Sequence, residues 1–379
     1  MSKIREAIYN QDFTLANELI NNDEDWNLDS FSASQIYQSL IKEEAFDVLK
    51  SFINKEQISL DVFEFDKFDN TIFGLLAEAK PTEKLFVFLD EIFPNIENID
   101  EDLNGISWLA YSVQVKSSVE FLQKLIDAGC SVEWKNNVNQ NLLSYTEDLE
   151  ITQFLLNQGV NVNQQDAGGN TVLFKAIDKQ NVPLIELYLQ NGADCNIQNK
   201  EAHTPYHKVV FNAMSSEIFD LLNNYEPIRL DLKNNNDQSL LFEFAEKGQF
   251  SWENENTLLE KLLEQGADLF QVETTIYQEE TTPARILAGK SYSLLEMISG
   301  KDGFNPNEQD NQGNTWLHYV CSENLNFDQQ KAQELYKKVK LLLKLGANPE
   351  ILNDQDKSAI DYAQDDDLKA KALTLLLKI

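Results

Sequence analysis

The chain has 379 residues, of which 63 are acidic and 31 basic, giving a formal net charge of −32. Nucleic-acid binding needs clusters of Lys and Arg opposite the phosphates, so this charge argues against that function. It argues equally against an anionic membrane surface. It favours a basic protein partner that is reached by electrostatic steering, although the same charge would also simply keep the chain in solution.

Hydrophobic residues make up 42% of the chain, which is ample for a buried core. No apolar run approaches the 18 residues of a membrane-spanning helix, and the first ten residues lack the basic-then-apolar pattern of a secretory signal. We therefore expect a cytoplasmic protein with no membrane contact. Cys130, Cys195 and Cys321 are odd in number and far apart, which is typical of buried thiols in a reducing compartment.

Residues 1–103 carry the weakest pattern. The apolar spacing from Ile4 to Ile20 predicts a pair of helices, and Ser34 and Thr71 each stand where a further helix could begin. We expect two or three degenerate repeats here, acting as an N-terminal cap. The alternating acidic stretch from Asp23 to Asp29 is spaced like a calcium loop, but its sixth position is Leu28 where Gly is needed, so no calcium site is predicted.

A repeating unit becomes readable from residue 104 and is clearest in Asp166–Asn196. Thr171 opens one apolar-periodic segment, and a second one ends at Gly192. The pattern begins again at Thr204-Pro205-Tyr206-His207, and Thr204 lies 33 positions after Thr171. Thr can cap the first amides of a helix, Pro suits the first helical position, and Gly suits the left-handed position after a helix. The spacing therefore predicts stacked helix–turn–helix units.

These residues resemble the ankyrin repeat, through its Asp-x-x-Gly-x-Thr finger, its Thr-Pro-Leu-His-x-Ala opening and its Leu-Leu-x-x-Gly-Ala-Asp close. The resemblance implies an all-α ankyrin-repeat solenoid of stacked helix–turn–helix units with β-turn fingers, in about nine or ten repeats. We expect degenerate repeats and a cap over 1–103, the ankyrin repeat array over 104–357, and a C-terminal capping repeat over 358–379.

Several units depart from the regular spacing. The unit from Asn141 to Gly159 is short, which predicts a truncated first helix, and Tyr225 replaces the Gly that should end a helix. Extra residues around 250–256 and 324–330 lengthen two helix connections. The finger over 267–281 exceeds the usual length by four residues.

The histidines are the residues that most invite a catalytic interpretation. His207 and His318 occupy the fourth position of the Thr-x-x-His motif, where the resemblance implies a structural hydrogen-bonding role. His203 lies four residues before His207, but Pro205 places it in the finger, and the glutamate of a zinc-protease helix is missing. We therefore predict no catalytic residue, no metal site and no cofactor, and we expect that the protein is not an enzyme.

The resemblance implies that the finger tips and the exposed side of the first helices form a concave surface for a protein partner. The tips are acidic and rich in amides, which tight turns also favour. Tyr277 is expected as an aromatic anchor with an acidic rim, and Trp316 stands at an open position where the family usually has Pro. The predicted partner-binding residues are Asp166, Asn199, Asn235, Asp237, Glu273, Tyr277, Glu279, Glu280, Asp310, Asn311 and Trp316.

The sequence thus favours a non-enzymatic interaction module, monomeric when unbound, whose acidic surface binds and inhibits a basic protein. Its concrete version is an immunity or antitoxin-type inhibitor. The first alternative is a secreted bacterial or viral ankyrin effector that scaffolds a host protein complex. The second is a structural array within a larger assembly.

Overall fold

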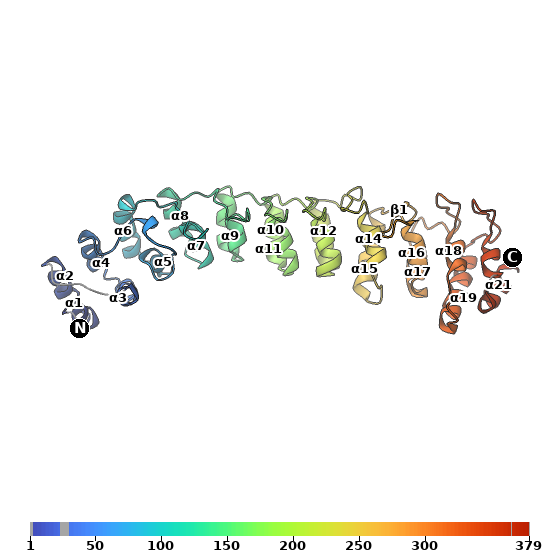
Figure 1. The fold of residues 1–379 in the computed structure, drawn as a ribbon, viewed down its shortest axis with the longest axis horizontal. Helices are drawn as coiled ribbons and strands as arrows, with labels where there is room; N and C mark the ends of the chain where they lie inside the picture. The colour runs from blue at the N-terminus through green and yellow to red at the C-terminus, as the bar shows by residue number, and fades with distance from the viewer. Residues whose placement is uncertain (1–2, 23–29, 365, 379) are drawn as a thin grey trace. The chain divides into compact units, whose positions relative to one another are not determined.

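The computed structural model describes residues 3–22, 30–364 and 366–378. The stretch Asp23–Asp29, considered above as a calcium loop, lies outside these residues. Two compact units make up the chain: unit 1 comprises Met1–Val172 and Pro183–Ala193, and unit 2 comprises Leu173–Val182 and Asp194–Ile379. In unit 2 the helices lie below the loops that join successive helix pairs (Figure 1). The expected boundaries at residues 103 and 357 concern repeat regularity and stay a prediction.

Unit 1 consists of short helices in successive pairs. Its helices are α1 (Lys3–Tyr9), α2 (Phe13–Asn21), α3 (Ser30–Lys42), α4 (Phe46–Asn54), η1 (Val62–Glu64), α5 (Ile72–Ala77), α6 (Glu83–Ile92), η2 (Phe93–Asn95), α7 (Trp108–Gln114), α8 (Val119–Asp127), η3 (Leu142–Tyr145), α9 (Leu149–Asn157) and most of α11 (Val182–Gln190).

Unit 2 repeats this arrangement and adds one small hairpin. Its elements are most of α10 (Val172–Asp178), then α12 (Pro205–Lys208), η4 (Val209–Ala213), α13 (Ser216–Tyr225), α14 (Leu240–Lys247), α15 (Glu253–Glu264), β1 (Glu273–Thr274), β2 (Glu280–Thr281), α16 (Pro283–Ala288), α17 (Tyr292–Ser299), α18 (Trp316–Ser322), α19 (Gln329–Lys344), α20 (Ala359–Gln364), η5 (Asp367–Lys369) and α21 (Ala370–Leu376).

The predicted all-α repeat fold is confirmed. Over the described residues the helices form eleven successive pairs, one with a 3-10 first helix, against the nine or ten repeats expected. The N-terminal prediction holds for the α1–α2 pair and for Thr71, whose hydroxyl accepts a hydrogen bond from the Gly74 amide. It is wrong for Ser34, because α3 already begins at Ser30.

The irregular units differ from the regular ones in local, explicable ways. The short unit has only the 3-10 turn η3 in place of its first helix, as predicted. After Tyr225, Glu226 is extended (φ −148°) instead of left-handed. The extra residues near 250–256 lie partly in the twelve-residue α15, and buried Glu255 accepts hydrogen bonds from the amides of Gln249 and Ser251.

Side chains of one repeat satisfy groups of the repeat before it. In unit 1, Trp108 is fully buried, and its indole N–H donates to the carbonyl of Phe73 at 3.0 Å. In unit 2, the buried lysines Lys338 and Lys369 donate to the carbonyls of Ala288 and Cys321, each at 2.7 Å.

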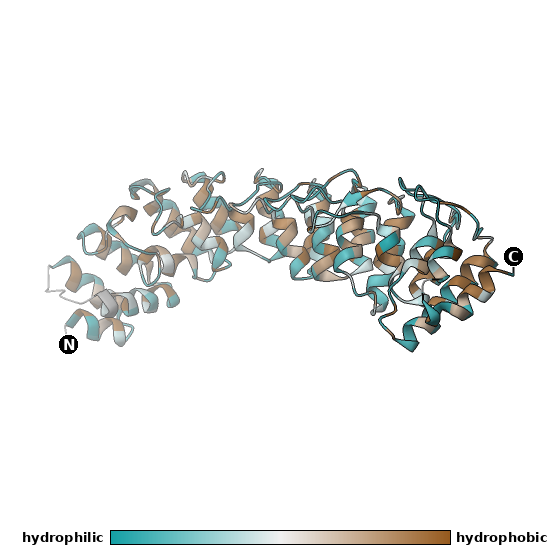
Figure 2. Cartoon of the chain, turned by 45° about the vertical axis from the view of Figure 1, so that its right-hand side comes forward, coloured by the Kyte–Doolittle hydropathy of each residue, from teal (hydrophilic) through white to brown (hydrophobic). Residues whose placement is uncertain are grey.

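Hydrophobic residues lie on helix faces and hydrophilic residues predominate in the fingers (Figure 2). Within the described residues, every helix is too short or too polar to cross a membrane.

Gly192 tests whether helix ends need a left-handed residue. Its φ is +81°, and a Cβ placed there would meet no heavy atom within 4 Å, so any cost of substitution comes from the backbone alone. We expect Gly192→Val to lower the free energy of unfolding by about 1–3 kcal/mol, because a β-branched residue is strained in this conformation. Urea denaturation followed by circular dichroism measures the change. Gly289→Ala is the control, because Gly289 has φ −75° and ordinary residues tolerate it. Equal stabilities of the Gly192 variant and wild type would contradict the expectation.

Candidate functional site

The acidic residues of the finger tips mostly hold the turns together. In unit 1, one carboxylate oxygen of Asp166 accepts hydrogen bonds from the amides of Gly168 and Asn170, at 2.8 and 2.9 Å. In unit 2, Asp310 accepts from Gln312 and Asn314 at 2.9 and 2.7 Å. The second oxygen of Asp310 also accepts hydrogen bonds, from the Asn314 side chain and the Tyr319 hydroxyl, so the first task of these carboxylates is to hold the turns.

The amide side chains divide into buried and exposed positions. Asn199 is 8% exposed and its oxygen accepts from the amides of Glu201 and His203, so its side chain holds the turn and little of it faces solvent. Asn235 and Asn311 are exposed. Asp237, also exposed, lies 3.5 Å from the ammonium group of Lys233.

Two further predicted binding residues are buried. Trp316 is 1% exposed, because its ring packs at 5.7 Å from Phe270 and 5.6 Å from Phe304. Both partners lie in the preceding loops and close the position that appeared open in sequence. Glu273 is 4% exposed, and its carboxylate accepts from the amide and hydroxyl of Ser239, both at 2.6 Å. Neither residue can contact a partner without disrupting this packing.

The long finger is a β-hairpin that presents exposed apolar and acidic side chains together. β1 and β2 pair antiparallel, and the Thr275 amide donates to the carbonyl of Glu279 at 2.9 Å. At the tip, Ile276 and Tyr277 are 62% and 80% exposed. Glu279 and Glu280 are exposed beside them, and neither forms an ion pair within the described residues. Ile276 was not predicted.

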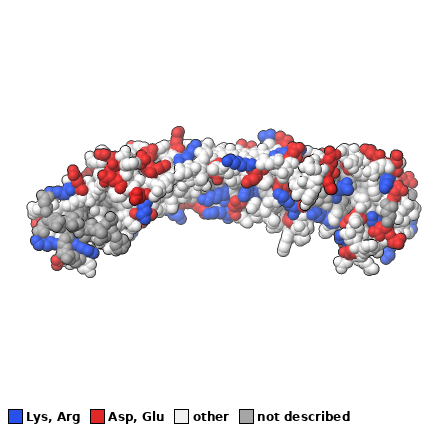
Figure 3. All heavy atoms as spheres, in the orientation of Figure 1, with Lys and Arg blue, Asp and Glu red and all other residues white. Residues whose placement is uncertain are grey.

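Neighbouring fingers of unit 2 lie against this hairpin. The Gln238 side chain donates to the carbonyl of Thr274 at 3.0 Å, which joins the finger of Asn235 and Asp237 to β1. On the other side, the Tyr319 hydroxyl lies 2.7 Å from Asp310 and 3.2 Å from the Thr282 hydroxyl. Along the finger edge of unit 2, acidic side chains are interspersed with basic ones (Figure 3).

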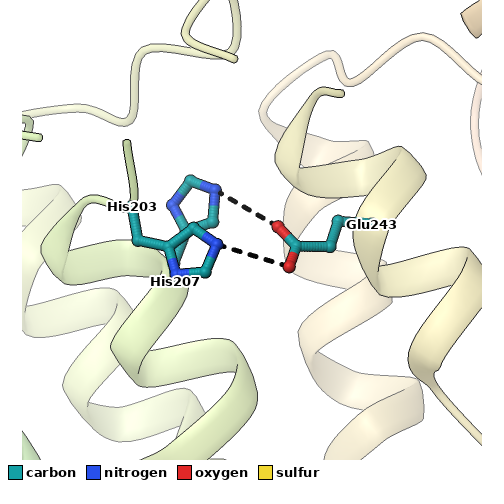
Figure 4. A group of neighbouring side chains, drawn as sticks. All are labelled: His203, His207 and Glu243. Carbon is teal, nitrogen blue, oxygen red and sulfur yellow. Dashed lines mark ion pairs between the residues drawn. The ribbon is translucent and has the colours of Figure 1, made fainter. Parts of the chain in front are cut away.

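A second cluster lies between two repeats of unit 2. His203 and His207 stack with ring centroids 4.8 Å apart, and both rings direct a nitrogen toward Glu243 of α14 (Figure 4). Their Nε2 atoms lie 3.4 and 3.8 Å from the two carboxylate oxygens. Sequence reasoning missed this group, because Glu243 follows His207 by 36 residues and lies in the next repeat.

Hydrogen bonds and burial set the charge states in this cluster. The Thr204 amide donates to Nδ1 of His207, as the structural role predicts, and burial together with nearby His203 lowers the pKa of His207 to about 4. Burial alone would raise the pKa of Glu243, but hydrogen bonds from His203, Lys247 and Asn234 lower it to about 2. At neutral pH the cluster therefore contains a neutral His207 and an ionised Glu243.

The cysteines offer no activated nucleophile. All three are buried, and burial raises the pKa of the Cys130 and Cys321 thiols to about 12 and that of Cys195 further. A thiol of this kind is almost wholly protonated at neutral pH and reacts poorly.

The chain is similar to proteins that contain ankyrin repeats. The family model described as "Ankyrin repeats (many copies)" matches residues 155–209. A fowlpox virus (strain NVSL) protein named for its ankyrin repeats is 27% identical over 117 residues, which cover 29% of this chain and 34% of that protein. The chain thus spans about a third of this relative.

Two solved structures are also similar. The ankyrin repeat domain of Bcl-3 has a TM-score of 0.47 and 18% identity, covering 61% of this chain and 93% of that one. The other is the complex of the endopeptidase Bd0816 from Bdellovibrio bacteriovorus with the immunity protein Bd3460; it has a TM-score of 0.39 and 21% identity, covering 54% of this chain and 98% of that one.

His318 tests the structural role of the Thr-x-x-His histidine. Its Nδ1 accepts from the Thr315 amide at 3.0 Å and its Nε2 lies 3.1 Å from the Lys357 carbonyl, so the neutral ring satisfies both groups. Burial lowers the pKa of His318 below 6.5, so the unfolded state takes up a proton first, and stability falls as the pH drops below about 6.5.

We expect His318→Gln to cost about 1–2 kcal/mol at pH 7.5 through the lost hydrogen bonds. The variant should also lose less stability than wild type between pH 7.5 and 5.5, because it lacks the His318 side chain that takes up a proton on unfolding. Urea denaturation at both pH values measures this. The other two histidines are present in both proteins, so their contributions cancel, and parallel pH dependences would contradict the expectation.

Proposed function

Because this chain is an ankyrin repeat protein, and ankyrin repeats are modules that bind other proteins, we propose that it acts by binding a basic protein through the hairpin finger of unit 2. It works without catalysis and inhibits its partner by covering a basic functional surface. The observation that carries this proposal is the tip of the β1–β2 hairpin, where Tyr277 is 80% exposed next to Glu279 and Glu280.

The hairpin has the composition of a binding anchor. A large exposed aromatic ring supplies contact area at a low cost in side-chain entropy, and a polar rim around it excludes water once a partner is bound. Ile276 enlarges the apolar area at the same tip. Residues 267–281 contain three glutamates and one aspartate but no lysine or arginine, so a cationic partner meets no repulsion there.

Long-range charge favours the same class of partner. A net charge of −32 accelerates encounter with a positively charged protein and slows encounter with an acidic one. Exposed Asp237 and half-buried Asp310 lie on the two fingers that neighbour the hairpin and add to this long-range field, although Asp237 lies 3.5 Å from Lys233 and Asp310 holds its own turn.

The concrete version is an immunity or antitoxin-type inhibitor in the cytoplasm, monomeric until it binds. A toxic enzyme that acts on nucleic acid carries a basic surface, and an acidic finger edge can occupy that surface. A neighbouring reading frame that encodes a basic toxin would support this version. An assay of the purified partner then decides, because an inhibitor abolishes the partner's activity when it binds.

The similarity to a fowlpox virus protein favours a second candidate, a secreted bacterial or viral effector that scaffolds a host complex. A scaffold leaves its partner active and joins it to a third protein. Size-exclusion chromatography of the complex, combined with the activity assay, distinguishes these two functions.

The hairpin charges should control the rate of association. With a partner recovered by affinity capture, Glu279→Lys with Glu280→Lys is expected to slow association about threefold to tenfold at low ionic strength and to flatten its salt dependence. Surface plasmon resonance over a range of salt concentrations measures both effects. The matched control is Glu217→Lys with Glu253→Lys, which changes the net charge equally at exposed positions in the first turns of α13 and α15. Because α15 has twelve residues, Glu253 lies about 18 Å from the finger along the helix.

Tyr277→Ala should act on dissociation instead, raising its rate by about tenfold or more if the ring is an anchor. Its effect on association is expected to be small. An acidic partner, or unchanged rates in both hairpin variants, would contradict the proposed function.

A further inference from the structure

We propose that His203, His207 and Glu243 form a zinc site that joins two successive repeats of unit 2. Two imidazole nitrogens and a carboxylate oxygen are a donor set that suits Zn²⁺, with a fourth position left for water. The inference is independent of the proposed partner, because none of the three residues belongs to the hairpin finger.

The separations between the donor atoms fit a tetrahedral ion. Bonds of about 2.0–2.2 Å at tetrahedral angles place neighbouring ligand atoms about 3.4 Å apart. The Nε2 atoms of His203 and His207 lie 3.4 and 3.8 Å from the oxygens of Glu243, and each residue has a ligand atom within 4.8 Å of the others. The stacked rings direct both nitrogens to the same side (Figure 4), so small rotations complete the set.

The second observation is an unsatisfied buried atom. His207 is 3% exposed and its Nε2 has no hydrogen-bond partner. In the same motif of a later repeat, Nε2 of His318 instead reaches the carbonyl of Lys357 at 3.1 Å. The motif alone therefore does not require an orphaned nitrogen, and at His207 that nitrogen faces a carboxylate which is 1% exposed.

The surroundings supply the further features of a metal site. The Asn234 side chain donates to the Glu243 carboxylate at 2.9 Å and fixes its orientation. His203 has a side chain 29% exposed, which gives an ion access from solvent.

Two neighbouring groups compete with a metal ion for its ligands and lower the affinity of the site. The ammonium group of Lys247 contacts the Glu243 carboxylate, but its side chain is 60% exposed and can turn into solvent. The Thr204 amide donates to Nδ1 of His207, so metal binding at Nε2 moves the ring proton to Nδ1. There the Thr204 hydroxyl, 3.0 Å away, accepts it, and the amide loses its acceptor.

The test is titration of the full chain, first stripped with a chelator, with Zn²⁺ by calorimetry and with Co²⁺ by visible absorption. The surface carboxylates of an acidic protein bind divalent ions loosely, so both titrations contain excess Mg²⁺ to occupy them. Mg²⁺ prefers oxygen ligands and does not compete for a site with two imidazole nitrogens. We expect one Zn²⁺ per chain, the absorption of tetrahedral Co²⁺, and a zinc-dependent rise in melting temperature.

Variants then assign the ligands. His203→Ala and Glu243→Gln should each weaken zinc binding about tenfold or more. Lys247→Met, which removes the competing ammonium group, should strengthen it. His318→Gln is the matched control and should bind zinc as wild type does. His203 is only partly buried, so its variant tests the site even if the Glu243 variant does not fold.

Absence of one-to-one binding in excess Mg²⁺ would overturn the proposal. So would wild-type zinc affinity in the folded His203→Ala variant, because the ion would then lie elsewhere on the acidic surface.

Discussion

The structure depends on a single constraint: a pair of short helices, most of them six to ten residues long, cannot bury its apolar face alone. Each pair must pack on the next, and the largest buried side chains serve that packing. Trp108 in unit 1 lies in edge-to-face contact with Phe73 at 4.9 Å and donates a hydrogen bond to the carbonyl of the same residue. Trp316 in unit 2 packs edge-to-face against Phe270 and, with tilted rings, against Phe304. An aromatic ring at this position therefore strengthens stacking and is lost to partner recognition.

The stacking of repeats also explains how the backbone carbonyls at the ends of short helices can be buried. The last carbonyls of a helix have no intrahelical donor. Lys338 and Lys369 supply donors from the next repeat to Ala288 and Cys321, in the place where the helix dipole favours a positive charge. The repeats thus satisfy one another's backbone as well as burying one another's apolar faces. The Nε2 atom of His207 is one of six buried side-chain atoms that lack a hydrogen-bond partner in the described part of the chain, and a buried polar atom without a partner calls for a physical reason.

Whether an interaction could be predicted from the sequence depends on how far apart its residues lie along the chain. Local rules succeed: Thr204 and His207 form a capping box, and Gly192 is left-handed. Even the truncated helix at Leu142–Tyr145 is readable from spacing alone. Interactions between repeats are not readable in this way. The burial of Glu273 by Ser239 and the approach of Glu243 to His203 join residues 34 and 40 positions apart, and each depends on how two repeats pack together. The exposure of the hairpin residues could be predicted in part from the sequence. An insertion that exceeds the repeat length has few neighbouring residues to bury it.

The acidic residues show why net charge and binding surface are different quantities. A carboxylate that accepts amide hydrogen bonds within a turn, as Asp166 and Asp310 do, still contributes to the long-range field that attracts a cationic partner. It cannot form a short contact with that partner without weakening its own turn. Every charged side chain of the protein therefore contributes to the electrostatic field. Short contacts with a partner can be made only by side chains that are not needed to hold a turn or to cap a helix. In unit 2 the hairpin tip meets this condition, because its fold is held by backbone pairing between β1 and β2 and by Thr275, which leaves the side chains of Tyr277, Glu279 and Glu280 exposed.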